Sequence, residues 1–170
     1  MAAPVNELIQ YSYQNPHSSM PMLIPMLVVC NTSEEDIGRN VYQNTAHDLK
    51  WIKPVEAHDG IAVMIGGGAS VENDIDRIKD LQAGGATVFA MNGASKWANK
   101  NGIKVDYQVI ADAKAETATL IDPMAQDYLL ASQVHEDTTA AAMSVKPPII
   151  WHLETGSIEK SFAPKEKYGG

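Results

Sequence analysis

The chain has 170 residues, 45% of them apolar, and a formal net charge of −8. This length suits one domain with a substantial core, and the acidity argues against nucleic acid or an anionic membrane as a partner, because both bind through clustered Lys and Arg. A single cysteine, Cys30, excludes an internal disulfide framework. Together with the lack of a basic leader before Arg39, it favours a cytoplasmic protein.

Residues 1–30 hold four prolines among polar and methionine-rich stretches without a sustained hydrophobic period. This composition predicts an extended arm that becomes ordered by docking on a neighbour. Its apolar run, residues 20–30, is too short to span a bilayer, which needs about 20 apolar residues. Hydroxyl and acidic residues at 32–36 are typical of a helix start, so residues 31–57 are expected to form a helix over 33–48 and an extended connection.

The apolar run at 61–65 (IAVMI) predicts a central strand buried on both faces. Gly66, Gly67 and Gly68 end it; their N–H groups are uncovered by side chains and free to take positive φ, which suits an anion. Ser70 is expected to be the N-cap of the next helix. A strand, a glycine turn and a helix predict a phosphate site at the carboxyl edge of a sheet, and the alternative is a tight turn without a ligand.

Apolar runs and helical stretches alternate over the rest of the chain. Strands are expected near 87–91, 107–111, 128–131 and 149–151, with helical segments between them, including one over 116–127. This alternation predicts right-handed crossovers and an α/β fold. We therefore expect a Rossmann-like three-layer domain over residues 58–170, with a mostly parallel sheet of about five strands and helices on both faces.

One acidic residue is the predicted metal ligand. Asp112 ends the strand expected at 107–111 between two small residues, and Mg²⁺ takes one or two carboxylates with phosphate and water. The alternative is a carboxylate that caps the next helix. Lys114 and Lys96 are candidates to neutralise phosphate charge, or are simply solvated.

Other residues near the strand ends narrow the class of ligand that is expected. Asn92 follows the second strand, where a dinucleotide site needs an acid, and Val71 replaces the third glycine of the dinucleotide fingerprint, so NAD is disfavoured. Asn92 is nevertheless included in the predicted nucleotide site. His152 follows the last strand and is a candidate acid or base.

Three segments within residues 58–151, IGGGAS, FAMNGASKWANKNGIK and VDYQVIADA, resemble the 6-hydroxymethylpterin diphosphokinase MptE-like family, which includes many phage-encoded members. The resemblance implies a Rossmann-like fold. For archaeal members it implies transfer of diphosphate from ATP to a hydroxymethyl pterin with Mg²⁺, whereas relatives in bacterial motility loci are associated with flagellin glycosylation. By position, it assigns the turn at 66–70 to the nucleotide and Asp112 to the metal.

The resemblance has two departures. Ala69 and Val105 stand where the family usually has proline, and the sequence stops at residues 169–170, where relatives continue into a Gly-rich segment and more strands. The second departure implies a domain shortened at its C-terminus.

Three functions are therefore open. The first is a diphosphokinase-type enzyme that binds Mg²⁺ and ATP and acts on a small-molecule acceptor, with Asp112 and Lys114 as catalytic residues. The second is a noncatalytic phage virion or assembly protein that uses residues 1–30 to contact particle neighbours or copies of itself. The third is a glycosyltransferase that uses a nucleotide sugar.

Overall fold

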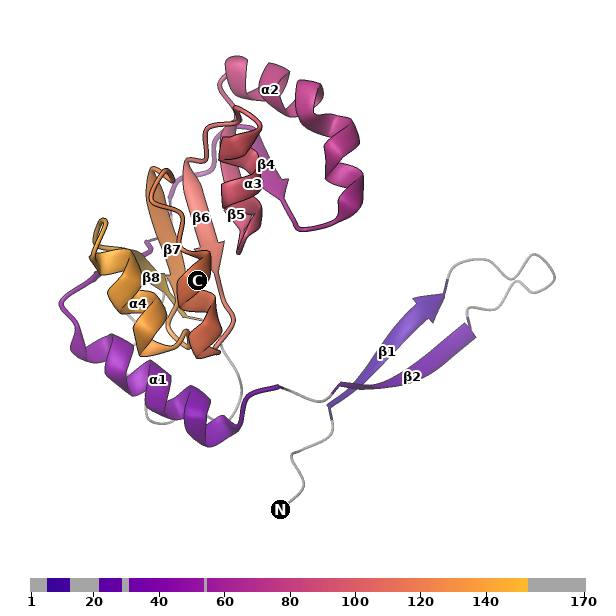
Figure 1. Ribbon diagram of the computed structural model, residues 1–170. Coiled ribbons are helices and arrows are strands. Elements are labelled where there is room, and N and C mark those ends of the chain that lie inside the picture. The colour runs from indigo at the N-terminus through magenta and orange to yellow at the C-terminus, as the bar shows by residue number, and fades with distance from the viewer. Residues whose placement is uncertain (1–5, 13–21, 29–30, 54, 153–170) are drawn as a thin grey trace. The chain divides into compact units, whose positions relative to one another are not determined.

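In the computed structural model of this chain, the described residues are 6–12, 22–28, 31–53 and 55–152 (Figure 1). The chain divides into two units, Met1–Ser33 and Glu34–Gly170. Cys30 and the last two glycines lie outside the described residues. The domain boundaries expected at residues 30 and 57 stay predictions.

The first unit contains a pair of antiparallel strands, β1 (Asn6–Ser12) and β2 (Met22–Val28). Asn6 pairs with Val28 at one end of the ladder, and Ser12 pairs with Met22 at the other. The sequence predicted an extended arm but not this pairing, because neither strand shows a clear alternation of apolar and polar residues. An isolated two-stranded sheet is at best marginally stable in water, so docking of this arm remains a prediction.

The second unit confirms the predicted α/β class. Its sheet has six parallel strands in the order β3-β8-β7-β6-β5-β4, flanked by helices and consistent with a Rossmann-like fold. The strands are β3 (Lys50–Trp51), β4 (Ala62–Ile65), β5 (Thr87–Met91), β6 (Tyr107–Ile110), β7 (Asp127–Ala131) and β8 (Ile149–Trp151). β3 is the additional strand, since its residues were expected to form only a connection.

The helices follow the expected order with one exception. They are α1 (Glu34–Ala46), the 3-10 helix η1 (Ala69–Asp74), α2 (Ile75–Ala83), α3 (Ala94–Lys100), the 3-10 helix η2 (Ala115–Leu120) and α4 (Glu136–Met143). The helix expected over 116–127 is wrong beyond Leu120. Pro123 disfavours helical backbone at the residue before it, and Asp122 Oδ1 accepts a hydrogen bond from Met124 N (3.0 Å) in a turn instead.

β4 is an edge strand, so the expectation of a central strand buried on both faces is wrong. Ile65 is buried, but the side chains of Ile61 and Met64 are 56% and 72% exposed. The physical reason is the position of β3 beside β8: the chain then crosses to the far edge of the sheet before it starts β4. The amino-acid composition of an apolar strand does not show whether the strand has one neighbouring strand or two, so it did not distinguish an edge strand from a central strand.

The strand order explains how the sheet is covered. From β4 to β8 each strand lies next to the previous one, so right-handed crossovers carry their helical segments to one face. Figure 1 shows α3 and α4 in front of the strands. One core cluster joins this face to the helices, and it includes Ile65, Ile78, Val88, Ala98, Ile110, Leu130, Ala142 and Ile150. On the other face, residues 52–53, 55, 58 and 60–61 of the connection from β3 to β4 line a groove together with strand residues.

Among the described residues, every helix falls short of the length or the apolarity needed to cross a bilayer.

Candidate functional site

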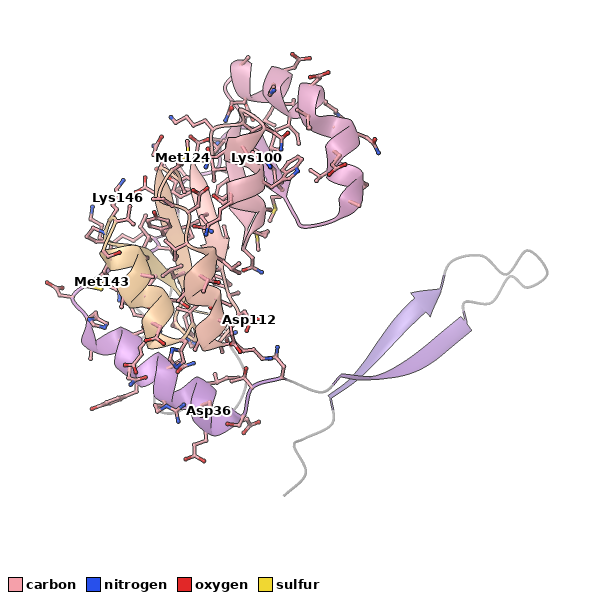
Figure 2. The ribbon with its side chains drawn as sticks, in the orientation of Figure 1. Asp36, Lys100, Asp112, Met124, Met143 and Lys146 are labelled. Carbon is pink, nitrogen blue, oxygen red and sulfur yellow. The ribbon has the colours of Figure 1, made fainter. Side chains whose placement is uncertain are left out.

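The predicted site residues lie at one edge of the sheet. Gly66 follows β4, Asn92 follows β5 and Asp112 lies just beyond β6, and these three strands are parallel neighbours. Adjacent strands are about 4.8 Å apart, so the glycine turn and Asp112 are separated by two strand spacings, about 10 Å. In Figure 2, Asp112 lies at the end of the sheet opposite to Lys100 and Met124. Whether these residues bind a ligand stays a prediction.

The glycine turn is open to solvent. Gly66, Gly67 and Gly68 are exposed and, with Gly93, Ala94 and Trp97 from the start of α3, they line a hollow of about 210 Å³. A Cβ atom built on Gly66 or Gly67 would meet no atom within 4 Å. The turn does not use the freedom of its glycines to take positive φ, because the positive-φ glycines of the described chain are Gly85 and Gly102. Neither packing nor backbone conformation therefore requires glycine at 66 and 67.

Ser70 is not the N-cap of a helix, which corrects the sequence prediction. It lies within η1, whose N-cap is Gly68, and α2 begins later with Asp74 as its N-cap. The three glycines lead into a tight 3-10 helix rather than directly into an α-helix. The hydroxyl still belongs to the turn, since a Cβ on Gly68 would lie 3.8 Å from Ser70 Oγ.

Asn92 is held in place by its main chain. Its φ of 49° is in the left-handed region, which Asn adopts more readily than most residues. Its N–H donates to Val109 O (2.9 Å), and its carbonyl accepts from Gln108 Nε2 (2.9 Å). The turn from β5 to α3 is therefore tied to β6.

Gln108 is a positioning residue that the sequence analysis missed. It is fully buried in β6, donates through Nε2 to Asn92 O (2.9 Å) and Leu120 O (2.7 Å), and accepts at Oε1 from Asp122 N (2.9 Å). The signal available in the sequence was a single amide inside the apolar strand YQVIA. This side chain fixes the ends of two loops at the predicted site.

Asp112 closes a short turn at the end of β6. Asp112 Oδ1 accepts a hydrogen bond from Lys114 N (3.1 Å), which occupies one of the two carboxylate oxygens. The N-cap of η2 is Lys114 and has no side-chain cap, so Asp112 does not cap that helix, which corrects the alternative given in the sequence analysis. The described residues contain no group of three or more His, Cys, Asp or Glu side chains that could hold a metal. Asp112 fits Mg²⁺ only if phosphate and water complete the coordination shell.

The lysines behave differently from each other. Lys114 is exposed beside Asp112, whereas Lys96 Nζ donates to Thr119 O (2.6 Å). Asp106, at the other end of β6, accepts from Val88 N (2.9 Å) through Oδ2. Asp106 therefore binds the backbone of the neighbouring strand β5, at the end of β6 opposite to Asp112.

The other half of the same sheet edge is closed by α1. Asn40 Nδ2 donates to Ala113 O (3.1 Å) and Gln133 O (3.1 Å), and one turn later Asn44 Nδ2 donates to Ser132 O (2.9 Å) and Val134 O (2.7 Å). Both asparagines are 1% exposed. The carbonyl groups beyond β7, and that of Ala113 beyond β6, are thus occupied by side-chain amides, whereas the glycine turn after β4 is exposed.

His152 lies in this closed half. Its Nδ1 is 2.7 Å from Ser132 Oγ, so the two side chains are hydrogen-bonded. Ser132 is fully buried, which removes it from contact with a solvent-borne substrate. A role for His152 as an acid or base stays a prediction.

A buried network ties α3 to the loop before β7. The Asp122 carboxylate accepts from Ser95 Oγ (2.7 Å) and Asn99 Nδ2 (2.7 Å), and Tyr128 Oη donates to Asp122 O (2.9 Å). Burial, followed by the negative charge of Asp122, raises the pKa of Tyr128 above its ordinary value. These groups are paired with each other, so we assign them to stability rather than to the site.

The fold and the sheet edge define an α/β domain of Rossmann-like type, and the comparisons with known proteins agree with that class. One similar solved structure is described as "Structure of MAf glycosyltransferase from Magnetospirillum magneticum AMB-1", with a TM-score of 0.62 and 21% sequence identity. The match covers 79% of this chain and 22% of that protein, so this chain spans about a fifth of its length. At this identity the likeness shows the fold alone.

The sequence matches no family model and no curated protein. The resemblance to the MptE-like family, although plausible for this fold, therefore stays a prediction.

Proposed function

We propose that this chain is the nucleotide-binding domain of a group transferase, with the donor phosphates at the turn 66–70. The observation that carries the proposal is the pair of exposed glycines, Gly66 and Gly67, whose added Cβ atoms would meet nothing. Because neither packing nor a positive φ requires them, close approach of a ligand to the main chain is the remaining reason for glycine. Their N–H groups suit phosphate oxygens, and Ser70 Oγ adds a further donor.

Asp112 and Lys114 supply the charges in this proposal. Asp112 lies about 10 Å from the turn across two strand spacings, and a metal ion bound to the donor phosphates would take this carboxylate as its one protein ligand. When bound, Mg²⁺ would offset phosphate charge at the leaving group. Lys114, exposed on the same loop, would offset the charge that remains.

Two donors fit this site. The resemblance to MptE-like proteins favours ATP with a hydroxymethyl acceptor, and the name of the structural neighbour, a glycosyltransferase, favours a nucleotide sugar. Both place nucleotide phosphates at the turn and differ in the group that is transferred. The distinction therefore lies in which donor stabilises the protein.

The test is a thermal melt with ATP, GTP or nucleotide sugars, each with and without Mg²⁺. A ligand at a hundredfold over its dissociation constant adds about 2.7 kcal/mol to the free energy of unfolding. For a chain of this size, the melting temperature should then rise by roughly 5–10 °C. The donor that produces the larger shift identifies the reaction class.

Gly67→Asp is the decisive variant. A carboxylate at position 67 enters open space, so the melting temperature without ligand should change little, but it repels phosphate and should abolish the shift. Gly38→Asp is the matched control, because a Cβ at Gly38 in α1 also meets nothing within 4 Å. Asp112→Asn should keep the bond from Lys114 N and lose the Mg²⁺ dependence.

An equal shift in wild type and Gly67→Asp would place the nucleotide elsewhere. If no nucleotide at millimolar concentration shifts the wild-type melt, nucleotide binding is refuted. The virion or assembly reading then becomes the better hypothesis.

A further inference from the structure

The second face of the sheet differs in its side chains from the face under the helices. Along β8, Ile150 is fully buried while its neighbour Ile149 is half-buried, and β5 repeats the pattern with Val88 and Phe89. Successive residues of a strand point to opposite faces, so this alternation shows one covered face and one open face. The open face includes Thr87, Phe89, Tyr107 and Ile149, whereas Leu129 of β7, which points to the same face, is buried.

A groove of about 850 Å³ lies over this face. Its floor is the set of strand residues just named, with Phe89 and Tyr107 stacked at a centroid distance of 5.1 Å. Its wall is the connection from β3 to β4, anchored by Ile52 N donating to Ile150 O (2.8 Å) and Thr87 N donating to Ile61 O (2.9 Å). We call this feature the open groove.

The open groove is apolar with a basic rim. Lys50, Lys53 and His58 line it, whereas Glu56 and Asp59 lie exposed on the same connection but outside the lining. Val55 and Ile61, also in the lining, are 79% and 56% exposed. An exposed apolar patch with a charged rim is typical of a docking surface.

We propose that the open groove binds an amphipathic α-helix of a partner polypeptide, with an apolar stripe toward the sheet and acidic residues along its flanks. Parallel sheets occur almost only with both faces covered, and within the described ranges no helix contributes to the groove. The acidic flanks follow from complementarity with the two lysines of the lining, Lys50 and Lys53.

The floor explains why the occupant is a helix. β5, β6, β7 and β8 are interior strands, each bonded to neighbours on both sides, so the face offers side chains and no free backbone groups. An extended peptide laid on it would leave its own N–H and C=O groups without partners. A helix satisfies its backbone internally and presents an apolar stripe.

The experiment uses the full chain and two synthetic 18-residue helical peptides. Both carry leucines at positions i, i+3, i+4 and i+7, and they differ only in having glutamate or lysine on the flanks. Calorimetric titration should show binding of the glutamate peptide and at least about tenfold weaker binding of the lysine peptide, a factor expected from a few rim charges. Equal affinities would overturn the acidic specification.

Two pairs of variants place the binding in the groove. Lys50→Glu with Lys53→Glu should weaken the glutamate peptide about tenfold, whereas the control, Lys79→Glu with Lys100→Glu on α2 and α3, should leave it unchanged. Ile61→Glu should also weaken it, and Met124→Glu is the matched control, since Met124 is 70% exposed and outside the groove. Equal losses in variant and control would overturn the assignment.

Two further outcomes also overturn the proposal. Failure of the full chain to bind either peptide would show that the groove is closed in solution. Sedimentation of the protein alone as a dimer that Ile61→Glu dissociates would make a second copy the occupant.

Discussion

The two faces of the sheet use the same strands for different purposes. On the helix side, Val88, Ile110, Leu130 and Ile150 are all 0% exposed and pack into one cluster. On the other side, Phe89, Tyr107 and Ile149 are partly exposed and line a groove together with the connection from β3 to β4. The helix side carries the core, and in our proposal the open side is the surface that a partner helix covers. The two roles would then fall on alternate residues of the same strand.

Ile150→Ala against Ile149→Ala is the largest contrast that we predict. Ile150 is fully buried, so its truncation should cost about 2–5 kcal/mol of the free energy of unfolding. Ile149 is half-buried, and the same change should cost at most about 1.5 kcal/mol. Urea unfolding of both variants measures the difference, and equal losses would mean that the open face is covered in solution.

Gln108→Leu tests the polar part of the covered face. The change removes three hydrogen bonds and leaves Asn92 O and Leu120 O without their donor, which should cost about 1–3 kcal/mol. Val109→Ala, at the partly exposed neighbouring position of β6, is the comparison and should cost less. Because Gln108 also holds the turn at Asn92, ligand-induced stabilisation should fall in Gln108→Leu and persist in Val109→Ala.

Tyr128→Phe should have the smallest effect on the free energy of unfolding at neutral pH, and its effect should depend on pH. Burial raises the pKa of Tyr128, so the folded state favours the neutral phenol, and this contribution is present below pH 10, the ordinary tyrosine pKa, and lost as the pH rises through the raised pKa. Wild type should therefore lose stability above pH 10 more steeply than Tyr128→Phe. Losing the bond to Asp122 O should cost the variant about 1 kcal/mol at neutral pH.

The control for this prediction is Tyr107→Phe, which removes a hydroxyl from the open face. Unfolding curves at several pH values between neutrality and the alkaline limit compare the variants. An identical alkaline slope in wild type and Tyr128→Phe would assign the pH dependence to other groups.

Local sequence patterns predicted most of the second unit. The strands expected near 87–91, 107–111, 128–131 and 149–151 agree with β5 to β8 within one residue at each end. Each is a short apolar run bounded by polar or glycine residues, so the limits follow from local composition. The same logic predicted that Gly66, Asn92 and Asp112 share an edge, because parallel strands end on the same side.

The features that the sequence analysis did not predict depend on contacts with residues that are distant in the chain. The two residues of β3 have no pattern of their own and form a strand only because β8 lies beside them. Ser70 carries a capping residue type, yet the backbone after Gly68 forms a 3-10 helix, so the α-helix starts at Ile75 instead. Gln108 appeared as an isolated polar residue because its partners are 12 to 16 positions away in the chain.

The sequence by itself determined the alternation of strands and helices, the parallel direction of the sheet and the placement of the glycine turn at its carboxyl edge. These features follow from hydrophobic period and chain chirality, which act over a few residues or one crossover. Only the tertiary structure decided that β4 is an edge strand and that Asn40 and Asn44 bind carbonyl groups at the carboxyl edge of the sheet. It also decided that, among the described residues, strand side chains on the second face line a groove. The reason is that strand order and the partners of buried amides depend on contacts between distant segments, which a one-dimensional pattern does not contain.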